Sequence, residues 1–299
     1  MYEDILVPTD GSDTALNAAE AAIALADRFG TRLHAVNVLE LGYLPPGFED
    51  EIPEALEYYG GNAVEEVETL ATDSGVEVTT DVVATDGPVH EALAGYVREH
   101  GIDCVVMGTQ GRTGLRKRLL GSTTERTMRL SSVPVFAVHE DHALDADFDE
   151  ILVPTDGSEG ALAAADHAID LATETGAALH VVYVVDSRSM GYDVGTVAVL
   201  EALEEAGQQA VDEIVERAEA AGVQSVQASV VTGTAAHSIT GYANDHDIDC
   251  IVMGTHGRSG VNRILLGSVT ERVVATADVP VLGVKAPEMV ETVEAEQEE

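Results

Sequence analysis

Residues 101–126 read GIDCVVMGTQGRTGLRKRLLGSTTER, and residues 247–272 read DIDCIVMGTHGRSGVNRILLGSVTER. Each stretch joins a short apolar run to a segment with regularly spaced glycines. The same offset of 146 residues relates DILVPTDGS at 4–12 to EILVPTDGS at 150–158. A repeat of this length exceeds the ~20–50 residues of a solenoid unit. The sequence therefore predicts two copies of one domain in tandem.

Two closing segments and a polar stretch set the predicted domain boundaries. VPVFAV at 133–138 and VPVLGV at 279–284 end the two copies with apolar runs. Polar residues after the first run indicate a linker, so we expect domains at 1–142 and 147–286. The remaining tail, 287–299, is acidic and has no aromatic residue, which predicts disorder.

Apolar runs and helical patterns alternate within each copy. Residues 5–7 form a continuous apolar run, as expected for a strand that is covered on both faces. Ser12 is placed to cap a helix that ends at Gly30. A second helix is expected at 54–73 and a third strand at 76–83. The alternation predicts an α/β fold in which each copy has a five-stranded parallel sheet with helices on both faces.

The segments that follow the first strand (residues 5–7) and the fourth strand, expected at 104–107, matter most. Ligands bind beyond the carboxyl ends of parallel strands where the strand order reverses. After strand four, both copies have the pattern G-x2-G-x9-G-S, formed by Gly108, Gly111, Gly121 and Ser122 and by Gly254, Gly257, Gly267 and Ser268. Glycines let backbone N–H groups approach an anion, and the last glycine opens a helix whose N-terminus attracts negative charge. The pattern indicates a phosphate cradle. The alternative is that the glycines only shape a strand–helix connection.

Basic residues gather around the same two segments. Nine of the fifteen Lys and Arg residues fall within 108–129 and 254–275, namely Arg112, Arg116, Lys117, Arg118, Arg126, Arg129, Arg258, Arg263 and Arg272. In a chain of formal net charge −39 this local reversal indicates an anionic ligand. The alternative is a salt-bridged patch against the acidic partner copy.

An aspartate follows strand one in each copy, Asp10 and Asp156, within the sequence PTDGS. At the point where strand order reverses, a carboxylate can accept from a ribose hydroxyl or an exocyclic amine, or help to hold a metal. Asp-Gly-Ser is also ordinary turn and cap chemistry, so that alternative stays open. The chain has no GxxxxGK[ST] pattern, and no His, Asp or Glu spacing resembles a metal cage.

The histidines give weaker signals. His256 lies inside the second glycine loop, but its counterpart is Gln110, so it is not a catalytic group that both copies require. Two other histidine positions recur between the copies, one at a strand start and one at a helix end. They are occupied by His34 and His180 and by His100 and His246. Those locations favour a structural or a solvent-exposed role.

The composition excludes several classes of protein. A net charge of −39 repels nucleic acid and anionic membranes, and no apolar stretch approaches the ~20 residues of a membrane span. The N-terminus MYEDILVPTD has no signal-peptide features, and Cys104 and Cys250 lie in apolar runs, as buried free thiols would. We therefore expect a cytoplasmic protein with no nucleic-acid or membrane partner. The carboxylate-rich surface predicts a salty cytoplasm, as in a haloarchaeon.

Across residues 1–286 the sequence resembles the universal stress protein family in a tandem two-domain form, through PTDGS, the G-x2-G-x9-G-S pattern and the closing VPV. The resemblance implies Rossmann-like domains of the adenine nucleotide alpha hydrolase type, with strand order 3-2-1-4-5. For members with this glycine signature it also implies ATP binding. Asp10 with Val38, and Asp156 with Val184, would then hold the adenine and the ribose.

The resemblance assigns the ribose and the phosphates to the glycine loops and their serines. Secondary contacts would come from neighbouring positions: Thr109, Arg112 and Thr123 in the first copy, and Thr255, Arg258 and Val269 in the second. A divalent cation, Mg or Mn, is expected on the phosphates rather than on protein side chains. Because Gln110 faces His256 and Thr123 faces Val269 in the alignment of the copies, the two sites are expected to differ in affinity.

The leading hypothesis is a regulatory ATP-binding protein of the stress response, with an unidentified protein partner. The resemblance also implies that the closing strands join the copies into an intramolecular pseudo-dimer, and it leaves a homodimer open. A slow ATP hydrolase or phosphotransferase is an alternative, although the sequence shows no P-loop lysine and no positioned general base. A nucleotide-independent scaffold or chaperone-like protein is another, against which stands the intact glycine pattern in both copies.

Overall fold

The computed structural model describes residues 1–43, 54–110, 120–140, 146–186, 196–257 and 265–286. The chain forms two compact units, and the boundary between them falls between Ala146 and Asp147. Each unit holds one copy of the repeat. The domain limits 1–142 and 147–286 stay predictions, and so does the disorder of 287–299, which lies outside the described residues.

The N-terminal unit alternates strands and helices. Its elements are β1 (Asp4–Pro8), α1 (Asp13–Phe29), β2 (Arg32–Glu40), the 3-10 turn η1 (Leu41–Tyr43), α2 (Glu54–Asp73), β3 (Val78–Thr85), α3 (Val89–His100), β4 (Cys104–Gly108), α4 (Ser122–Leu130) and β5 (Val135–Val138). The strands pair in parallel in the order β3-β2-β1-β4-β5. This order confirms the strand order 3-2-1-4-5 that was expected.

The C-terminal unit has the same architecture. Its elements are β6 (Glu150–Thr155), α5 (Glu159–Thr175), β7 (Ala178–Asp186), α6 (Thr196–Ala221), β8 (Val226–Gly233), α7 (Ala235–Asp245), β9 (Cys250–Gly254), α8 (Ser268–Thr276) and β10 (Val281–Val284). The strands are again parallel, in the order β8-β7-β6-β9-β10. The fold of tandem Rossmann-like domains is therefore confirmed in both copies.

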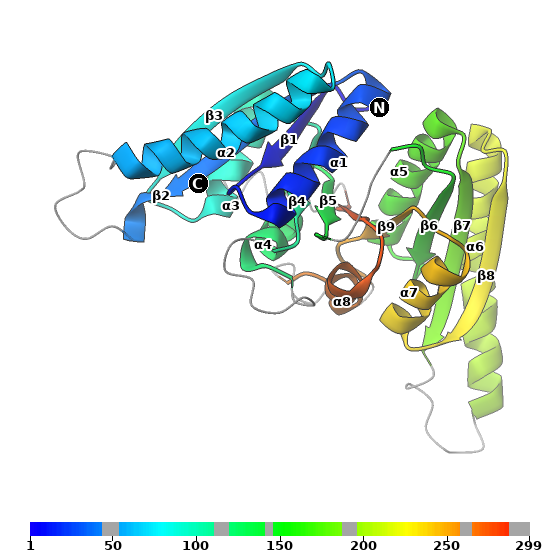
Figure 1. Ribbon diagram of the computed structural model, residues 1–299. Coiled ribbons are helices and arrows are strands. Elements are labelled where there is room, and N and C mark those ends of the chain that lie inside the picture. Colours follow the sequence, from blue (N-terminus) through cyan, green and yellow to red (C-terminus); the bar gives the residue numbers. More distant parts are fainter. Residues whose placement is uncertain (44–53, 111–119, 141–145, 187–195, 258–264, 287–299) are drawn as a thin grey trace. The chain divides into compact units, whose positions relative to one another are not determined.

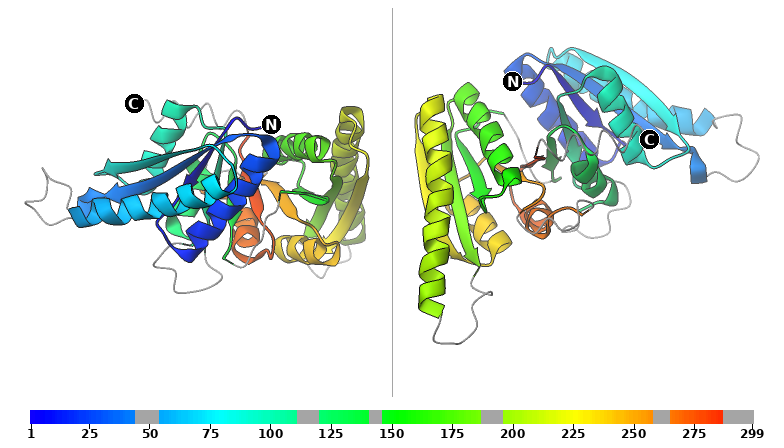
Figure 2. Two further views of the ribbon diagram at one scale, coloured as in Figure 1. Left: turned by 45° about the horizontal axis from the view of Figure 1, so that its top comes forward. Right: turned by 180° about the vertical axis from the view of Figure 1, so that it is seen from behind.

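Helices cover both faces of each sheet. In the N-terminal unit α1 and α2 pack on one face, and α3 and α4 on the other (Figure 1). In the C-terminal unit α5 and α6 share one face, and α7 and α8 share the other (Figure 2). Because both faces are covered, Ile5, Leu6 and Val7 of β1 have 0% exposure, which explains the continuous apolar run.

The first helix of each unit has the ends that its sequence predicts. The Ser12 side chain accepts a hydrogen bond from the Ala15 N–H and caps α1, and Gly30 ends that helix with a left-handed φ of 67°. Ser158 caps α5 in the same way, and Gly176 ends it with a φ of 84°. Glycine adopts this conformation without the steric cost of a side chain. The two serine caps fix the residue at which α1 begins after β1 and α5 begins after β6.

The core contains two cysteines and is otherwise mainly aliphatic. Cys104 and Cys250 are buried free thiols, and burial raises the pKa of the Cys250 thiol. Such a thiol stays protonated and unreactive. Within the described ranges, no helix combines the length and the apolar character needed to cross a bilayer.

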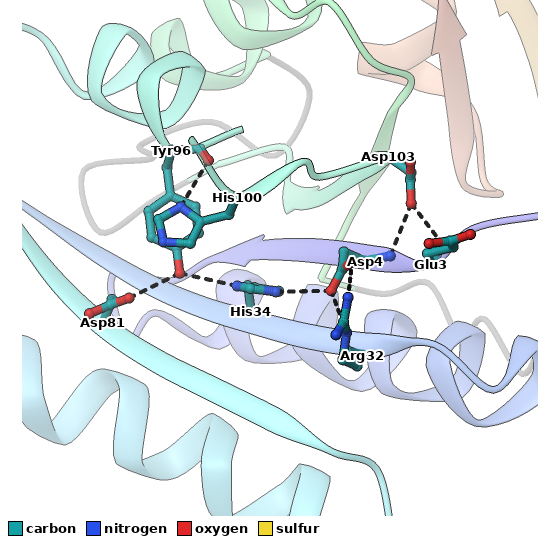
Figure 3. A network of polar contacts seen from close by, with 8 residues as sticks. All are labelled: Glu3, Asp4, Arg32, His34, Asp81, Tyr96, His100 and Asp103. Carbon is teal, nitrogen blue, oxygen red and sulfur yellow. Dashed lines mark hydrogen bonds and ion pairs between the residues drawn. The ribbon is translucent and has the colours of Figure 1, made fainter. Parts of the chain in front are cut away.

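A chain of hydrogen bonds links β1, β2, β3 and α3 in the N-terminal unit (Figure 3). The His34 ring lies 3.1 Å from the Tyr96 hydroxyl through Nδ1 and 3.1 Å from the Asp4 carboxylate through Nε2. Arg32 also donates to Asp4, with Nε 2.8 Å from Oδ1. The Tyr96 hydroxyl donates to Asp81 at 3.0 Å. Because Asp4, His34 and Tyr96 are buried, these bonds satisfy polar groups that water does not reach.

The C-terminal unit builds the same network with a different carboxylate. His180 lies 3.0 Å from the Tyr242 hydroxyl through Nδ1 and 2.6 Å from the Glu150 carboxylate through Nε2. The His246 ring stacks on Tyr242 with the ring centroids 3.8 Å apart, as the corresponding rings do in the N-terminal unit. His34 and His180 are thus buried members of the networks, whereas His100 and His246 are exposed and stack on the tyrosines.

Replacing Tyr96 by Phe removes the hydroxyl that contacts both His34 and Asp81. The buried Nδ1 atom of His34 then loses a partner, so we expect the free energy of unfolding to fall by about 1–3 kcal/mol. Urea unfolding at fixed high salt measures the loss. The control Tyr58→Phe alters a side chain on α2 that is 66% exposed, and should change the free energy by less than about 0.5 kcal/mol. Equal losses in the two variants would contradict this account of the network.

The ion pair between Arg32 and Asp4 predicts a pH dependence. Hydrogen bonding from Arg32 is the main reason that the pKa of Asp4 lies below its ordinary value. Such a carboxyl stabilises the fold above its ordinary pKa of about 3.9, and this contribution is lost as the pH falls through the lower folded value. Arg32→Ala, which copies Ala178 of the second repeat, should lower the urea midpoint at pH 7 but make less difference below about pH 4. A difference that is independent of pH would instead assign the loss to packing of the Arg32 stem.

Candidate functional site

Each unit has a cavity at the carboxyl end of its sheet, where the strand order reverses. In the N-terminal unit the cavity encloses about 340 Å³ among the ends of β1, β2 and β4 and the starts of α3 and α4. In the C-terminal unit the corresponding cavity encloses about 250 Å³. These volumes lie near the lower end of the range for small-ligand sites, roughly 300–1,000 Å³. Doubly wound sheets bind their ligands at this position.

The structure brings most of the predicted site residues to these two cavities. The first cavity is lined by Asp10, Val38, Gly108, Gly121, Ser122 and Thr123. The second is lined by Asp156, Val184, Gly254, Gly257, Gly267, Ser268 and Val269. Thr109 and Thr255 do not line either of these two cavities and are only 1% exposed. Gly111, Arg112 and Arg258 lie outside the described residues.

Asp10 and Asp156 form turns and also line the cavities. Asp10 Oδ1 accepts from the backbone N–H of Ser12 at 3.0 Å and from its hydroxyl at 2.6 Å. Asp156 Oδ1 accepts from the backbone N–H of Ser158 at 3.0 Å. The turn-and-cap chemistry that the sequence left open is therefore present in both copies. These turns fix the carboxylates at the cavity walls.

The helix that follows each glycine loop begins at the cavity. The Gly121 N–H donates to the Thr109 carbonyl at 2.7 Å, and the corresponding bond in the C-terminal unit is 2.8 Å long. The N-cap residues of α4 and α8 are Gly121 and Gly267, which have no side chain to cap the helix. Residues 122–124 and 268–270, which form the first turns, line the cavities. Their N–H groups have no intrahelical acceptor and attract negative charge.

Two glycines of the C-terminal unit are required by close contacts. A Cβ atom on Gly160, near the start of α5, would lie 2.5 Å from the His256 carbonyl oxygen. A Cβ atom on Gly257 would lie 2.6 Å from Asp156 Oδ2. The missing side chains thus let the second glycine loop pack against the start of α5 and against the carboxylate. Gly160 corresponds to Thr14 in the N-terminal unit, so the two loops are packed differently.

Several lining residues were not identified from the sequence. The first cavity also contains Asn37 and Glu40, and the second contains Ile239. Gln110 and His256, which the sequence marked as a difference between the two glycine loops, line the cavities as well. Glu40 lies two residues beyond Val38 on β2, and the alternation of side chains along a strand could have revealed it. For Asn37 and Ile239 the sequence carries no comparable signal. The first cavity is consequently more polar than the sequence suggested.

Two predicted features of the site are only partly covered by the structure. Of the nine basic residues near the glycine loops, Arg126, Arg129 and Arg272 are described, and they lie on α4 and α8. The anionic ligand inferred from that cluster stays a prediction. In the part of the chain that the structure covers, no three His, Cys, Asp or Glu side chains are grouped so as to hold a metal ion.

The fold and the cavities define a tandem, doubly wound α/β protein in which each repeat has a cavity at the carboxyl end of its sheet. The family model described as the universal stress protein family matches residues 1–139 and, a second time, residues 147–285. The chain belongs to the universal stress protein family, in its tandem two-domain form. This finding confirms the resemblance seen in the sequence.

Relatives match either one copy or both. The universal stress protein MJ0531 of Methanocaldococcus jannaschii is 42% identical over 146 residues, which are 47% of this chain and 84% of that protein. A universal stress protein of Mycolicibacterium smegmatis is 27% identical over 296 residues, 94% of this chain and 96% of that protein. The crystal structure of a universal stress protein from Archaeoglobus fulgidus has a TM-score of 0.72 at 25% identity, and covers 95% of this chain and 98% of its own. The tandem arrangement is thus shared with full-length relatives.

The close packing of Gly160 can be tested by adding one methyl group. Gly160→Ala should lower the free energy of unfolding by about 1–3 kcal/mol, because its Cβ atom displaces the His256 carbonyl. Thermal unfolding measures this loss. The control Gly241→Ala on α7 meets no atom within 4 Å and should instead stabilise the protein by about 0.5–1 kcal/mol. If both variants gain stability, the loop is not packed against α5 as described.

Proposed function

We propose that this protein is a regulatory protein of the stress response that binds one adenine nucleotide, ATP, in each repeat. The observation that carries the proposal is that α4 and α8, each with a glycine as its N-cap, begin at a cavity that also contains Asp10 or Asp156. Backbone N–H groups suit phosphate oxygens, and a carboxylate suits a ribose hydroxyl or an exocyclic amine. Each cavity therefore offers both kinds of group that a nucleotide needs.

The lining residues suggest how a nucleotide would lie. Asp10 and Val38, at the ends of β1 and β2, would hold the adenine and ribose, as Asp156 and Val184 would in the second cavity. The phosphates would lie against the first turns of α4 and α8. Thr123 and Val269, second residues of those helices, would add backbone contacts. The roles of Thr109 and Thr255 are indirect in this arrangement, since both side chains are buried.

A divalent cation, Mg or Mn, would accompany the phosphates. The described residues include no carboxylate cluster that could hold it alone, so the phosphate oxygens and water would supply most of its ligands. The cation would neutralise charge on the bound phosphates. Such neutralisation would reduce the repulsion between the phosphates and a chain of net charge −39.

The remaining expectations about context stay predictions. They are a cytoplasmic location, a haloarchaeal source, a protein partner, pairing of the repeats through β5 and β10, and a homodimer. An ATP hydrolase or phosphotransferase, and a nucleotide-independent scaffold, are outcomes of the experiment that follows. Neither is favoured by a specific contact in the described cavities.

Small molecules released from protein purified at high salt should include up to two adenine nucleotides per chain. Gly121→Val and Gly267→Val each place a side chain against a carbonyl oxygen, because even a Cβ atom would lie 2.9 Å from the Thr109 oxygen or 3.0 Å from the Thr255 oxygen. Each single variant should retain one nucleotide, and the double variant none. Mass spectrometry and calorimetric titration with ATP measure the stoichiometry.

The untouched site of each single variant serves as the internal control for folding. Gly95→Ala and Gly241→Ala, where a Cβ atom meets nothing within 4 Å, should keep both sites. Nucleotide retention by the double variant would refute the assignment of the cavities. Failure of the wild type to bind any nucleotide at high salt would favour a scaffold, and ATP turnover well above that of the double variant would favour an enzyme.

A further inference from the structure

Thr109 is held by three hydrogen bonds at the start of the first glycine loop. Its N–H donates to the Val138 carbonyl at the end of β5, at 2.9 Å. Its carbonyl accepts from the Gly121 N–H at 2.7 Å. Its hydroxyl is hydrogen-bonded to His139 Nδ1 at 2.8 Å. The residue thereby joins the closing strand of the sheet to the start of α4.

Thr255 has the same three bonds in the C-terminal unit. Its N–H donates to the Val284 carbonyl at the end of β10, at 2.9 Å, and its carbonyl accepts from the Gly267 N–H at 2.8 Å. Its hydroxyl is hydrogen-bonded to His256 Nδ1 at 3.0 Å. Both threonines are 1% exposed, so water does not replace the imidazole as a partner.

The two imidazoles come from different positions in the repeat. His139 follows the closing strand β5, and its counterpart in the second copy is Lys285. His256 follows its threonine directly in the glycine loop, and its counterpart in the first copy is Gln110. Each copy therefore has one histidine at one of two positions, and both histidines reach the equivalent hydroxyl. The shared feature is the contact between the threonine hydroxyl and an imidazole, not a residue at a fixed position.

This contact acts on the groups that face the cavity. The hydrogen bond from the imidazole to the threonine hydroxyl holds the threonine side chain in one rotamer. It thereby fixes the threonine carbonyl, which accepts the N–H of Gly121 or Gly267. That bond aligns the first turn of α4 or α8. The N–H groups of 122–124 and 268–270, which line the cavities, then point from a fixed helix start. A shift of that turn would misplace every donor together.

We propose that Thr109 with His139, and Thr255 with His256, are positioning pairs that set the phosphate-facing start of α4 and of α8. The inference rests on the proposed nucleotide binding for its effect on affinity. The threonines act through the backbone, since their side chains do not line the cavities. The imidazole is exchangeable between the two chain positions, which gives a direct test.

ATP binding at the first site is measured separately in the full-length chain that carries Gly267→Val, which removes the second site. The measurement is a calorimetric titration with Mg-ATP at high salt. His139→Leu should weaken binding about tenfold, because the hydroxyl loses its partner. Adding Gln110→His, the arrangement of the second copy, should restore affinity to within about threefold of the parent. The second site is measured in the same way in the chain that carries Gly121→Val. There His256→Leu should weaken ATP binding, and adding Lys285→His should restore it.

Two threonine variants separate positioning from general stability. Thr109→Ser keeps the hydroxyl and should bind as the parent does. Thr109→Val should bind like His139→Leu, and Gln110→His should not rescue it, because the imidazole acts through the hydroxyl. Parent affinity in His139→Leu, or failure of Gln110→His to rescue it, would overturn the proposal for the first copy. Failure of Lys285→His to rescue His256→Leu would overturn it for the second.

A measurement without nucleotide keeps this proposal distinct from the proposed function. Amide exchange of Gly121, whose N–H is bonded to the Thr109 carbonyl, should be about tenfold faster in His139→Leu and return in the Gln110→His double variant. If the wild type binds no nucleotide, the proposed function fails while this exchange pattern still supports the pairs. Unchanged exchange at Gly121 would overturn them even if ATP binds.

Discussion

The first turns of α4 and α8 have backbone N–H groups that the helix itself does not bond, and the N-cap residue of each helix is a glycine, which has no side chain to cap them. Parallel strands and right-handed crossovers bring these turns to the edge of the sheet where the strand order reverses. Each turn then borders a cavity together with the end of strand one. Because N–H groups at a helix start attract negative charge, this position suits the anionic ligand that we propose. The arrangement of the site follows from that constraint.

The negative net charge of the chain opposes the binding of an anion at these helix starts. A chain of −39 repels a polyanion at long range, so binding of an anion at these cavities would depend on local attraction, from the N–H donors and from the basic residues near the glycine loops. High salt shortens the range of the repulsion, to a Debye length of about 3 Å at 1 M, while hydrogen bonds from N–H groups inside a cavity are much less screened. Asp10 and Asp156 are compatible with the same ligand, since each carboxylate is held in its own turn and can accept from the uncharged end of a nucleotide.

Much of the fold followed from periodicity and caps. The helix expected at 54–73 is α2 (Glu54–Asp73), and Ser12 and Gly30 bound α1 as expected. The strand expected at 76–83 is instead β3 (Val78–Thr85). This strand forms the edge of its sheet and is partly exposed along its length, so no continuous apolar run marks its ends. The site residues could be predicted where they belong to a sequence motif. Asn37 and His139 could not be predicted, because each contacts a residue about thirty positions away in the sequence, Thr9 and Thr109 respectively.

The two copies differ most where a side chain, rather than the backbone, makes the contact. At the His34 and His180 positions the imidazole keeps its tyrosine partner while Asp4 is replaced by Glu150 and Arg32 by Ala178. At the threonine of the glycine loop the imidazole itself comes from another position. Two backbone hydrogen bonds have the same lengths within 0.1 Å in both copies. One runs from the threonine N–H to a carbonyl of the closing strand, and the other from the N-cap glycine N–H to the threonine carbonyl. The backbone geometry beside the two cavities is therefore the same, while the side chains that hold it differ. For this reason we expect the two proposed sites to bind the same kind of ligand with unequal affinities.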